Sequence, residues 1–133
     1  MPLPESVIAC ECWARDGLQS LPVFVSTDHK VQMIERIARA GFAKLEVTSF
    51  SNPKLLPQFA DAAEVLGRIA RHAGVSYVVL MPNTRGFDRF ETCQKEGRHT
   101  AAVLQCIGDG ASQGSKIDDL KKLCPAKVAV KAL

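Results

Sequence analysis

Several polar side chains that could do chemistry stand at or just after the ends of apolar segments in this sequence. They are Glu11, Arg15 and Asp16 around the end of the first segment, Glu46 and Thr48 at the end of the second, and Asn83 after the third. Carboxylates suit a divalent cation, which can polarise a hydroxyl or a carbonyl, and an arginine can neutralise a developing enolate. These residue types therefore form a reasonable set for making or breaking a bond beside a carbonyl.

Two of these residues have a ready structural interpretation. Asp16 precedes Gly17, and this pair is common in turns. Arg15 could simply form an ion pair with Glu11 or Glu46. Glu46 is harder to explain in this way, because a carboxylate within an apolar strand is rarely buried without a partner.

Hydrophobic patterning predicts three strand–helix units that would position these residues. Strands are expected at residues 6–12, 43–48 and 75–81, and helices from 26–28 to 40–41, from about 59 to 74, and from 85 to about 93. Repeats of about 30 residues are typical of parallel βαβ connections. This is an α/β pattern, either a doubly wound sheet or the opening of a β/α barrel, and both place active sites at the carboxyl edge of the strands.

The pattern changes after residue 96. We divide the chain into residues 1–96, which hold three βα units, and residues 97–133, a divergent and poorly patterned segment. Within the second part, residues 100–107 could form a fourth strand and residues 117–123 a short helix.

Composition narrows the class of protein. The chain has 133 residues, of which 47% are hydrophobic, and its net charge of +3 lies entirely within residues 116–133, so we expect no nucleic-acid partner. Its five cysteines show no C-x-x-C spacing, which favours reduced thiols over a zinc site or a disulfide framework. No apolar run approaches the roughly 18 residues of a membrane span, so we expect no membrane partner and a cytoplasmic protein.

Three motifs resemble a known family. Residues Glu11–Gln19 (ECWARDGLQ) are similar to the Arg-Asp-Gly-x-Gln motif of acyl-CoA lyases and acyl-transferring synthases, and Leu45–Asp61 (LEVTSFSNPKLLPQFAD) is similar to the lyase version of the second strand and its loop. Val78–Phe87 (VVLMPNTRGF) also fits the lyases. Over residues 6–93 the chain therefore resembles the N-terminal part of the 3-hydroxy-3-methylglutaryl-CoA lyase family. This implies the first part of a (β/α)8 TIM barrel, incomplete in this chain.

The resemblance also implies a function. It predicts a retro-aldol type cleavage of 3-hydroxy-3-methylglutaryl-CoA, or a related 3-hydroxyacyl-CoA, to acetyl-CoA and acetoacetate, as in leucine degradation. It makes the acyl-CoA the partner and Mg²⁺ or Mn²⁺ the cofactor, and it allows a homodimer for a full-length enzyme. The implied roles are catalysis by Arg15 and Glu46, metal binding by Asp16, substrate binding by Arg15, Gln19 and Thr48, and support by Glu11 and Asn83.

Two departures from the family pattern leave alternatives open. Cys12-Trp13-Ala14 replaces a Val-Gly-Pro run, and the later paired-histidine metal motif and reactive cysteine of the family have no counterpart in this sequence. A β/α barrel also needs about 200–250 residues. We therefore expect a truncated form that is inactive alone. The alternatives are a noncatalytic remnant or interaction module, and a related acyl-transferring synthase.

Overall fold

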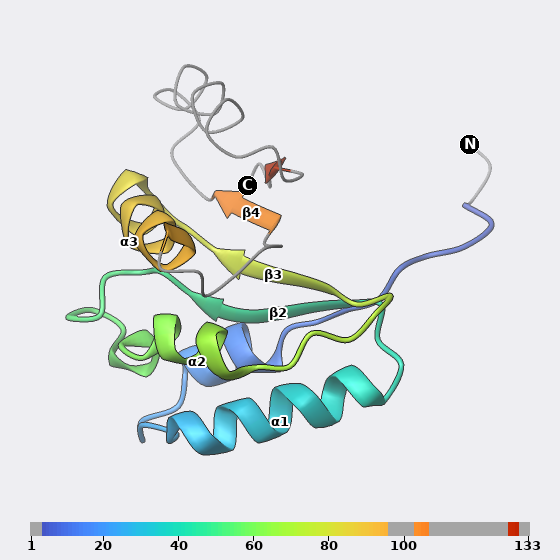
Figure 1. The fold of residues 1–133 in the computed structure, drawn as a ribbon, viewed down its shortest axis with the longest axis horizontal. Helices are drawn as coiled ribbons and strands as arrows, with labels where there is room; N and C mark the ends of the chain where they lie inside the picture. Colours follow the sequence, from blue (N-terminus) through green and yellow to red (C-terminus); the bar gives the residue numbers. More distant parts are fainter. Residues whose placement is uncertain (1–3, 96–102, 107–127, 131–133) are drawn as a thin grey trace.

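The computed structural model describes residues 4–95, 103–106 and 128–130, and its centre is one parallel β-sheet (Figure 1). The strands are β1 (Cys10–Glu11), β2 (Lys44–Ser49), β3 (Ser76–Leu80), β4 (Val103–Cys106) and β5 (Val128–Val130). They lie in the order β1-β2-β3-β4-β5, and every neighbouring pair is parallel. The expected α/β architecture with a parallel sheet is thus confirmed. The sequential strand order has no topological switch point, unlike the order of a doubly wound sheet.

Helices and short helical turns connect the first strands. They are η1 (Trp13–Gly17, a π-helical turn), α1 (Thr27–Arg39), η2 (Pro57–Phe59, a 3₁₀ turn), α2 (Ala62–Arg68) and α3 (Thr84–Lys95). The Ser26 hydroxyl accepts a hydrogen bond from the His29 amide, so Ser26 caps α1 at the predicted start. Gly41 follows the helix with a φ of 95°, a conformation that favours glycine, and it turns the chain into β2.

The apolar core lies between the sheet and these helices. On β2, Leu45 and Val47 belong to it, and on β3 it includes Tyr77 and Val79. The helices contribute Val31, Ile34 and Ala38 from α1, Ala62, Val65 and Leu66 from α2, and Phe87, Phe90 and Cys93 from α3. Because side chains alternate along a strand, the residues between these positions point to the opposite face of the sheet.

Two predicted elements differ from the observed ones. Strand β1 is shorter than the predicted 6–12, because Cys10 pairs with Lys44, the first residue of β2, and the residues before Cys10 extend beyond their neighbour. The predicted helix from 59 to 74 divides into η2 and the shorter α2, which ends where Ile69 takes an extended conformation.

The later segment contributes to the sheet as well. A strand within 100–107 is confirmed by β4, whereas β5 was not expected. The helix predicted at 117–123 lies outside the described residues. The division at residue 96 stays a prediction.

Gly86, in the first turn of α3, allows a close approach that a larger residue would block. A Cβ atom there would lie 2.7 Å from the carbonyl oxygen of Phe50. We expect Gly86→Ala to lower the free energy of unfolding by about 1–3 kcal/mol, because crowding a packed site outweighs the gain of about 1 kcal/mol in helix propensity. Gly67→Ala, at an exposed position in α2, is the control and should stabilise the chain. Denaturant titration of both variants measures the difference, and equal effects would contradict the packing argument.

Candidate active site at the carboxyl edge of the sheet

The π-helical turn η1 presents Arg15 and Asp16 directly after β1. The backbone amides of Arg15, Asp16 and Gly17 all point to the carbonyl oxygen of Cys12, at 3.1, 2.8 and 3.4 Å. The turn is also held at its start, since the Glu11 carboxylate accepts a hydrogen bond of 2.9 Å from the Trp13 amide. Glu11 therefore has a structural role in shaping the turn that carries the two predicted functional residues. Short π-helical turns are frequent at functional sites.

Arg15 of η1 and Glu46 of β2 form a largely buried ion pair. The Glu46 side chain is only 3% exposed and that of Arg15 is 15% exposed. Arg15 Nη2 donates a hydrogen bond of 3.1 Å to Glu46 Oε2. Arg15 Nε lies 2.8 Å from Glu46 Oε1 without hydrogen-bond geometry, so neither atom has a hydrogen-bond partner among the described residues. Of the two partners proposed for Arg15 from the sequence, the structure selects Glu46.

Asp16 completes the cluster at its solvent side. Its side chain is 69% exposed, and its Oδ1 accepts a hydrogen bond of 2.8 Å from Arg15 Nη1. Arg15 thus lies between a buried and an exposed carboxylate. Burial lowers the pKa of Arg15, but the hydrogen bond and charge of Glu46, together with the charge of Asp16, outweigh it and raise that pKa overall. The guanidinium therefore keeps its charge at the centre of the site.

The other residues predicted for the site, Asn83, Gln19 and Thr48, do not join the cluster around Arg15. Asn83 follows β3 and caps α3, because its side-chain oxygen accepts a hydrogen bond of 2.9 Å from the Gly86 amide. Gln19 lies just after η1 and is exposed. Thr48 is buried, and the strand register pairs it with Val79, a member of the helix-side core. The roles predicted for Gln19 and Thr48 in substrate binding stay predictions.

A register shift in β2 explains the position of Thr48 and indicates another residue. Glu46 pairs with Val78, but Thr48 pairs with Val79, so β2 has one more residue than β3 over this stretch. Ser49 consequently pairs with Leu80 and lies on the same face as Glu46. Ser49 is fully buried, and its hydroxyl lies 2.7 Å from the hydroxyl of Ser51. Ser49 could not be assigned to the site from the sequence, because simple alternation puts it on the opposite face from Glu46.

A second polar group ties together the two loops that follow β1 and β2. Lys30, whose side chain is 3% exposed, donates hydrogen bonds of 2.7 Å to Asp61 and 2.6 Å to the carbonyl oxygen of Gln58. The Gln58 side chain in turn donates to the carbonyl oxygens of Leu21 and Val23. These contacts, which we call the Lys30 network, fix the loop after η1 against the loop before α2.

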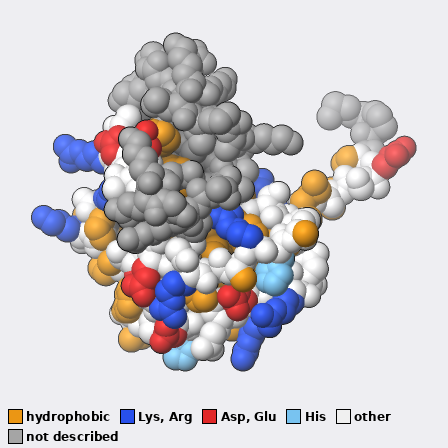
Figure 2. Space-filling model, in the orientation of Figure 1, with side chains coloured by type: hydrophobic (Ala, Val, Ile, Leu, Met, Phe, Trp, Pro, Cys, Tyr) orange, Lys and Arg blue, Asp and Glu red, His pale blue; other side chains and the backbone are white. Residues whose placement is uncertain are grey.

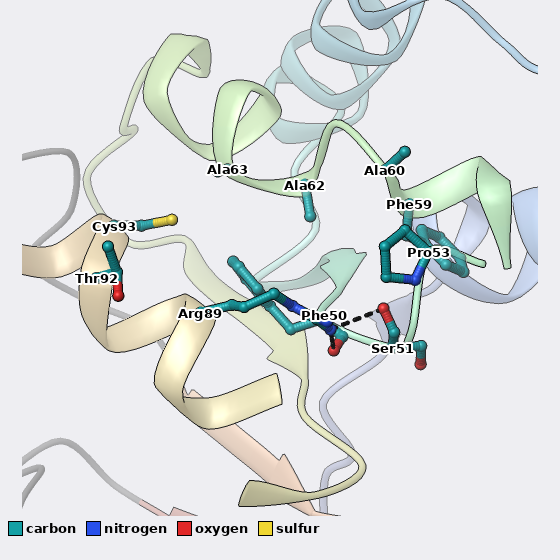
Figure 3. A pocket seen from close by; sticks show the side chains of 10 residues that line it. All are labelled: Phe50, Ser51, Pro53, Phe59, Ala60, Ala62, Ala63, Arg89, Thr92 and Cys93. Atoms are coloured by element: carbon teal, nitrogen blue, oxygen red, sulfur yellow. Dashed lines mark hydrogen bonds between the residues drawn. The ribbon is translucent and has the colours of Figure 1, made fainter. Parts of the chain in front are cut away.

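A cavity of about 330 Å³ lies nearby, between the loop after β2, helix α2 and helix α3 (Figure 3). Its lining is mostly apolar. Arg89 forms part of its wall and donates hydrogen bonds to the carbonyl oxygens of Phe50 and Ser51, the latter at 2.8 Å. The cavity contains neither Arg15 nor Glu46 in its lining, so we do not assign the chemistry to it. Arg89 instead holds the loop after β2 against α3.

The fit of the site to a divalent cation is incomplete. Mg²⁺ and Mn²⁺ need several oxygen or nitrogen donors. In the described ranges, no group of three His, Cys, Asp or Glu residues is arranged to hold a metal ion. Asp16 is exposed and can supply one ligand, whereas Glu46 is engaged by Arg15. These residues by themselves do not form a cation site.

The described surface carries charges of both signs. On the face seen in Figure 2, acidic and basic side chains are interspersed. Among the helices within residues 4–95, none is both long enough and apolar enough to cross a membrane.

Comparison with solved structures identifies the class of protein that shares this fold. The chain is similar to an HMG-CoA lyase from Acinetobacter baumannii solved in complex with coenzyme A and 3-methylmalate, with a TM-score of 0.77 and 27% identity over 91% of the chain and 43% of that structure. It is also similar to the HMG-CoA lyase from Brucella melitensis, with a TM-score of 0.65 and 39% identity over 73% of the chain and 32% of that structure. The class is therefore that of acyl-CoA lyases with an α/β fold.

Curated relatives give the same family. Hydroxymethylglutaryl-CoA lyase YngG from Bacillus subtilis is 42% identical over 88 residues, which are 66% of this chain and 29% of that protein. The cytoplasmic 3-hydroxy-3-methylglutaryl-CoA lyase of Rattus norvegicus is 46% identical over 84 residues, which are 63% of this chain and 24% of that protein. No family model matches the chain. The resemblance to the 3-hydroxy-3-methylglutaryl-CoA lyase family is thus confirmed, and the chain spans less than a third of the length of these curated relatives.

Proposed function

We propose that this chain carries the first part of the active site of a carbon–carbon lyase that cleaves 3-hydroxy-3-methylglutaryl-CoA, or a related 3-hydroxyacyl-CoA, to acetyl-CoA and acetoacetate. The observation that supports this most strongly is the buried ion pair of Arg15 and Glu46 at the carboxyl edge of the sheet. The sequential order of parallel strands supports a β/α barrel as the architecture of the complete enzyme.

In this proposal Arg15 acts on the charge that develops during cleavage. Breaking the bond leaves negative charge on the carbonyl oxygen of the acetyl-CoA enolate. A positive guanidinium already held in place can stabilise that charge without reorganising during the reaction. Glu46 holds the guanidinium by a hydrogen bond to Nη2 and by its opposite charge close to Nε, while Nη1 donates to Asp16 on the exposed side. Glu46 is thus the residue that positions Arg15.

We further propose that Asp16 is the carboxylate that this chain contributes to a Mg²⁺ or Mn²⁺ site. Bound metal would supply Lewis-acid polarisation of a substrate oxygen. Asp16 is exposed at the edge of the sheet, so its carboxylate is accessible to a metal ion and to the other ligands that the ion needs. The acyl-CoA partner, a homodimer and a cytoplasmic location belong to the same proposal.

The test is a chimera. Residues 6–93 of this chain replace the equivalent segment of the Bacillus subtilis lyase, and cleavage of 3-hydroxy-3-methylglutaryl-CoA is measured with Mg²⁺ or Mn²⁺. We expect the chimera to be active, because the transplanted segment brings Arg15, Asp16 and Glu46 in the required arrangement. A folded but inactive chimera would contradict the proposal and favour the noncatalytic remnant. Formation of the carbon–carbon bond in preference to its cleavage would favour the synthase.

The chain by itself should show no turnover in the same assay. At the candidate site the exposed Asp16 is the carboxylate available to a metal ion, the described residues hold no group of three candidate ligands, and such a site needs several donors. The measurement combines Mn²⁺ titration with detection of acetyl-CoA. Micromolar Mn²⁺ binding with substrate cleavage would overturn this expectation while supporting the lyase assignment.

A further inference from the structure

Cys10 and Cys12 present two reduced thiols side by side at the end of β1. Their sulfur atoms are 3.9 Å apart, and Cys12 Sγ also lies 3.6 Å from the carbonyl oxygen of Cys10. Cys12 has a φ of −125° and a ψ of 14°, so the backbone departs from the extended form there. Cys10 is exposed and Cys12 is partly buried. The two sulfurs must approach each other by about 2 Å to reach the length of a disulfide bond.

Cys12 also anchors η1, the turn that carries the proposed functional residues Arg15 and Asp16. The carbonyl oxygen of Cys12 accepts the amides of Arg15, Asp16 and Gly17. Burial first, and then the neighbouring Glu46 and Cys10, raise the pKa of the Cys12 thiol to about 12, so Cys12 forms its thiolate slowly and the exposed Cys10 is the thiol that reacts first. Because these amides bind the backbone of Cys12 itself, we expect a covalent bond at the Cys12 side chain to weaken the hydrogen bonds that shape η1.

We propose that Cys10 and Cys12 are a reversible redox pair that a small-molecule disulfide, such as oxidised glutathione, converts to an intrachain disulfide. The exposed Cys10 thiolate attacks the glutathione disulfide, forms a mixed disulfide and releases one glutathione thiolate. Cys12 then loses its proton to solvent, attacks the Cys10 sulfur and releases the second glutathione. Two thiols are oxidised and one glutathione disulfide is reduced to two thiols, so electrons balance.

The small ring predicts that this disulfide is labile. Two cysteines separated by one residue close a tight ring, and departures from preferred disulfide geometry store strain that makes the bond easier to reduce. Strained or exposed disulfides have the more oxidising potentials, and they are the labile or regulatory ones. We therefore expect excess reduced glutathione to reopen the bond. The significance of this disulfide for catalysis by Arg15 rests on the proposed function, whereas the thiol chemistry itself does not.

Peptide mapping tests the bond directly. The purified chain is equilibrated in mixtures of reduced and oxidised glutathione, alkylated and digested with trypsin. The first basic residue is Arg15, so one peptide, residues 1–15, contains both cysteines and no other. We expect that peptide to be two hydrogens lighter and unalkylated in the oxidised mixtures, and doubly alkylated in the reduced ones. Trp13, the single tryptophan of the chain, gives a second reading through its fluorescence.

Single variants provide the controls. Cys10→Ser and Cys12→Ser should each leave one thiol in residues 1–15 that carries glutathione instead of an internal bond, and Cys93→Ala should keep the disulfide. Alkylation of both thiols at every glutathione ratio would overturn the proposal. So would bonds from Cys10 or Cys12 to Cys93, Cys106 or Cys124.

Hydrogen exchange tests the connection to η1. In the oxidised chain, the amides of residues 15–17 should exchange faster by about 2- to 10-fold for each hydrogen bond to Cys12 that is lost. Equal exchange in both forms would overturn the effect on η1. Neither measurement requires catalytic activity, so a failure of the lyase assay leaves both results interpretable.

Discussion

Arg15→Gln in the chimeric lyase lowers kcat by about 10²- to 10³-fold, the loss that follows removal of one preorganised group that stabilises transition-state charge. Glutamine keeps an amide donor but no positive charge, so the enolate loses its charge partner. Steady-state kinetics with saturating Mn²⁺ measure the change. Arg68→Gln is the matched control: this arginine pairs with Asp28 at an exposed site, its side chain is 43% exposed, and its loss should leave kcat unchanged.

Asp16→Ala separates the two proposed roles. We expect it to reduce Mn²⁺ affinity together with activity, because it removes a proposed ligand, whereas Arg15→Gln should leave Mn²⁺ affinity largely intact. Mn²⁺ titration of the two chimeric variants gives the comparison. An equal loss of Mn²⁺ affinity in both would contradict these assignments.

Asp61→Ala should lower the free energy of unfolding of the chain by about 3–5 kcal/mol, the usual consequence of removing one partner from a buried ion pair. Among the described residues, the buried charge of Lys30 would then keep only its hydrogen bond to the carbonyl oxygen of Gln58 and its contact with the Phe24 ring, whose centroid is 4.2 Å away. Asp61 also accepts a hydrogen bond of 2.7 Å from the Thr27 hydroxyl, and this contact is lost as well. Denaturant titration gives the free energy.

Two further variants test the origin of that loss. Asp28→Ala breaks the exposed pair with Arg68 and should lower stability far less than Asp61→Ala, because solvent screens an exposed ion pair. Lys30→Met combined with Asp61→Leu replaces both charges by apolar side chains and should cost less than Asp61→Ala alone, because no charge stays buried. A similar loss from Asp28→Ala and Asp61→Ala would show that burial of Lys30 is unimportant.

The strand–helix alternation could be predicted because its signals are local. The apolar run of β3 and the Ser26 cap of α1 are visible in the sequence, and the structure has both close to where they were expected. The contact of Arg15 with Glu46 was one of two open pairings. Parallel strands bring their carboxyl ends to one edge, but only the shape of η1 decides which carboxylate Arg15 meets.

Other features depend on contacts between distant segments and have no local signal. The Lys30 network joins residues about 30 positions apart, and a lysine on an otherwise amphipathic helix predicts an exposed side chain. The extra residue in β2 is likewise set by its pairing with β3. Alternation alone would put Thr48 on the face of Glu46 and Ser49 on the opposite face, whereas the register does the reverse.

The extra residue in β2 determines where this strand can lose a residue during evolution. Because Val47 is the residue without a paired partner in the register, its deletion would leave Glu46 opposite Val78 and Ser49 opposite Leu80. Both faces of the strand would keep their residues, and the main loss would be one core side chain. Deleting Ser49 would instead remove a residue from the face of Glu46 and bring Phe50 toward it. A distant relative with a shorter second strand should therefore be aligned with its one-residue gap inside the strand, between Glu46 and Thr48, and not in the loop that follows.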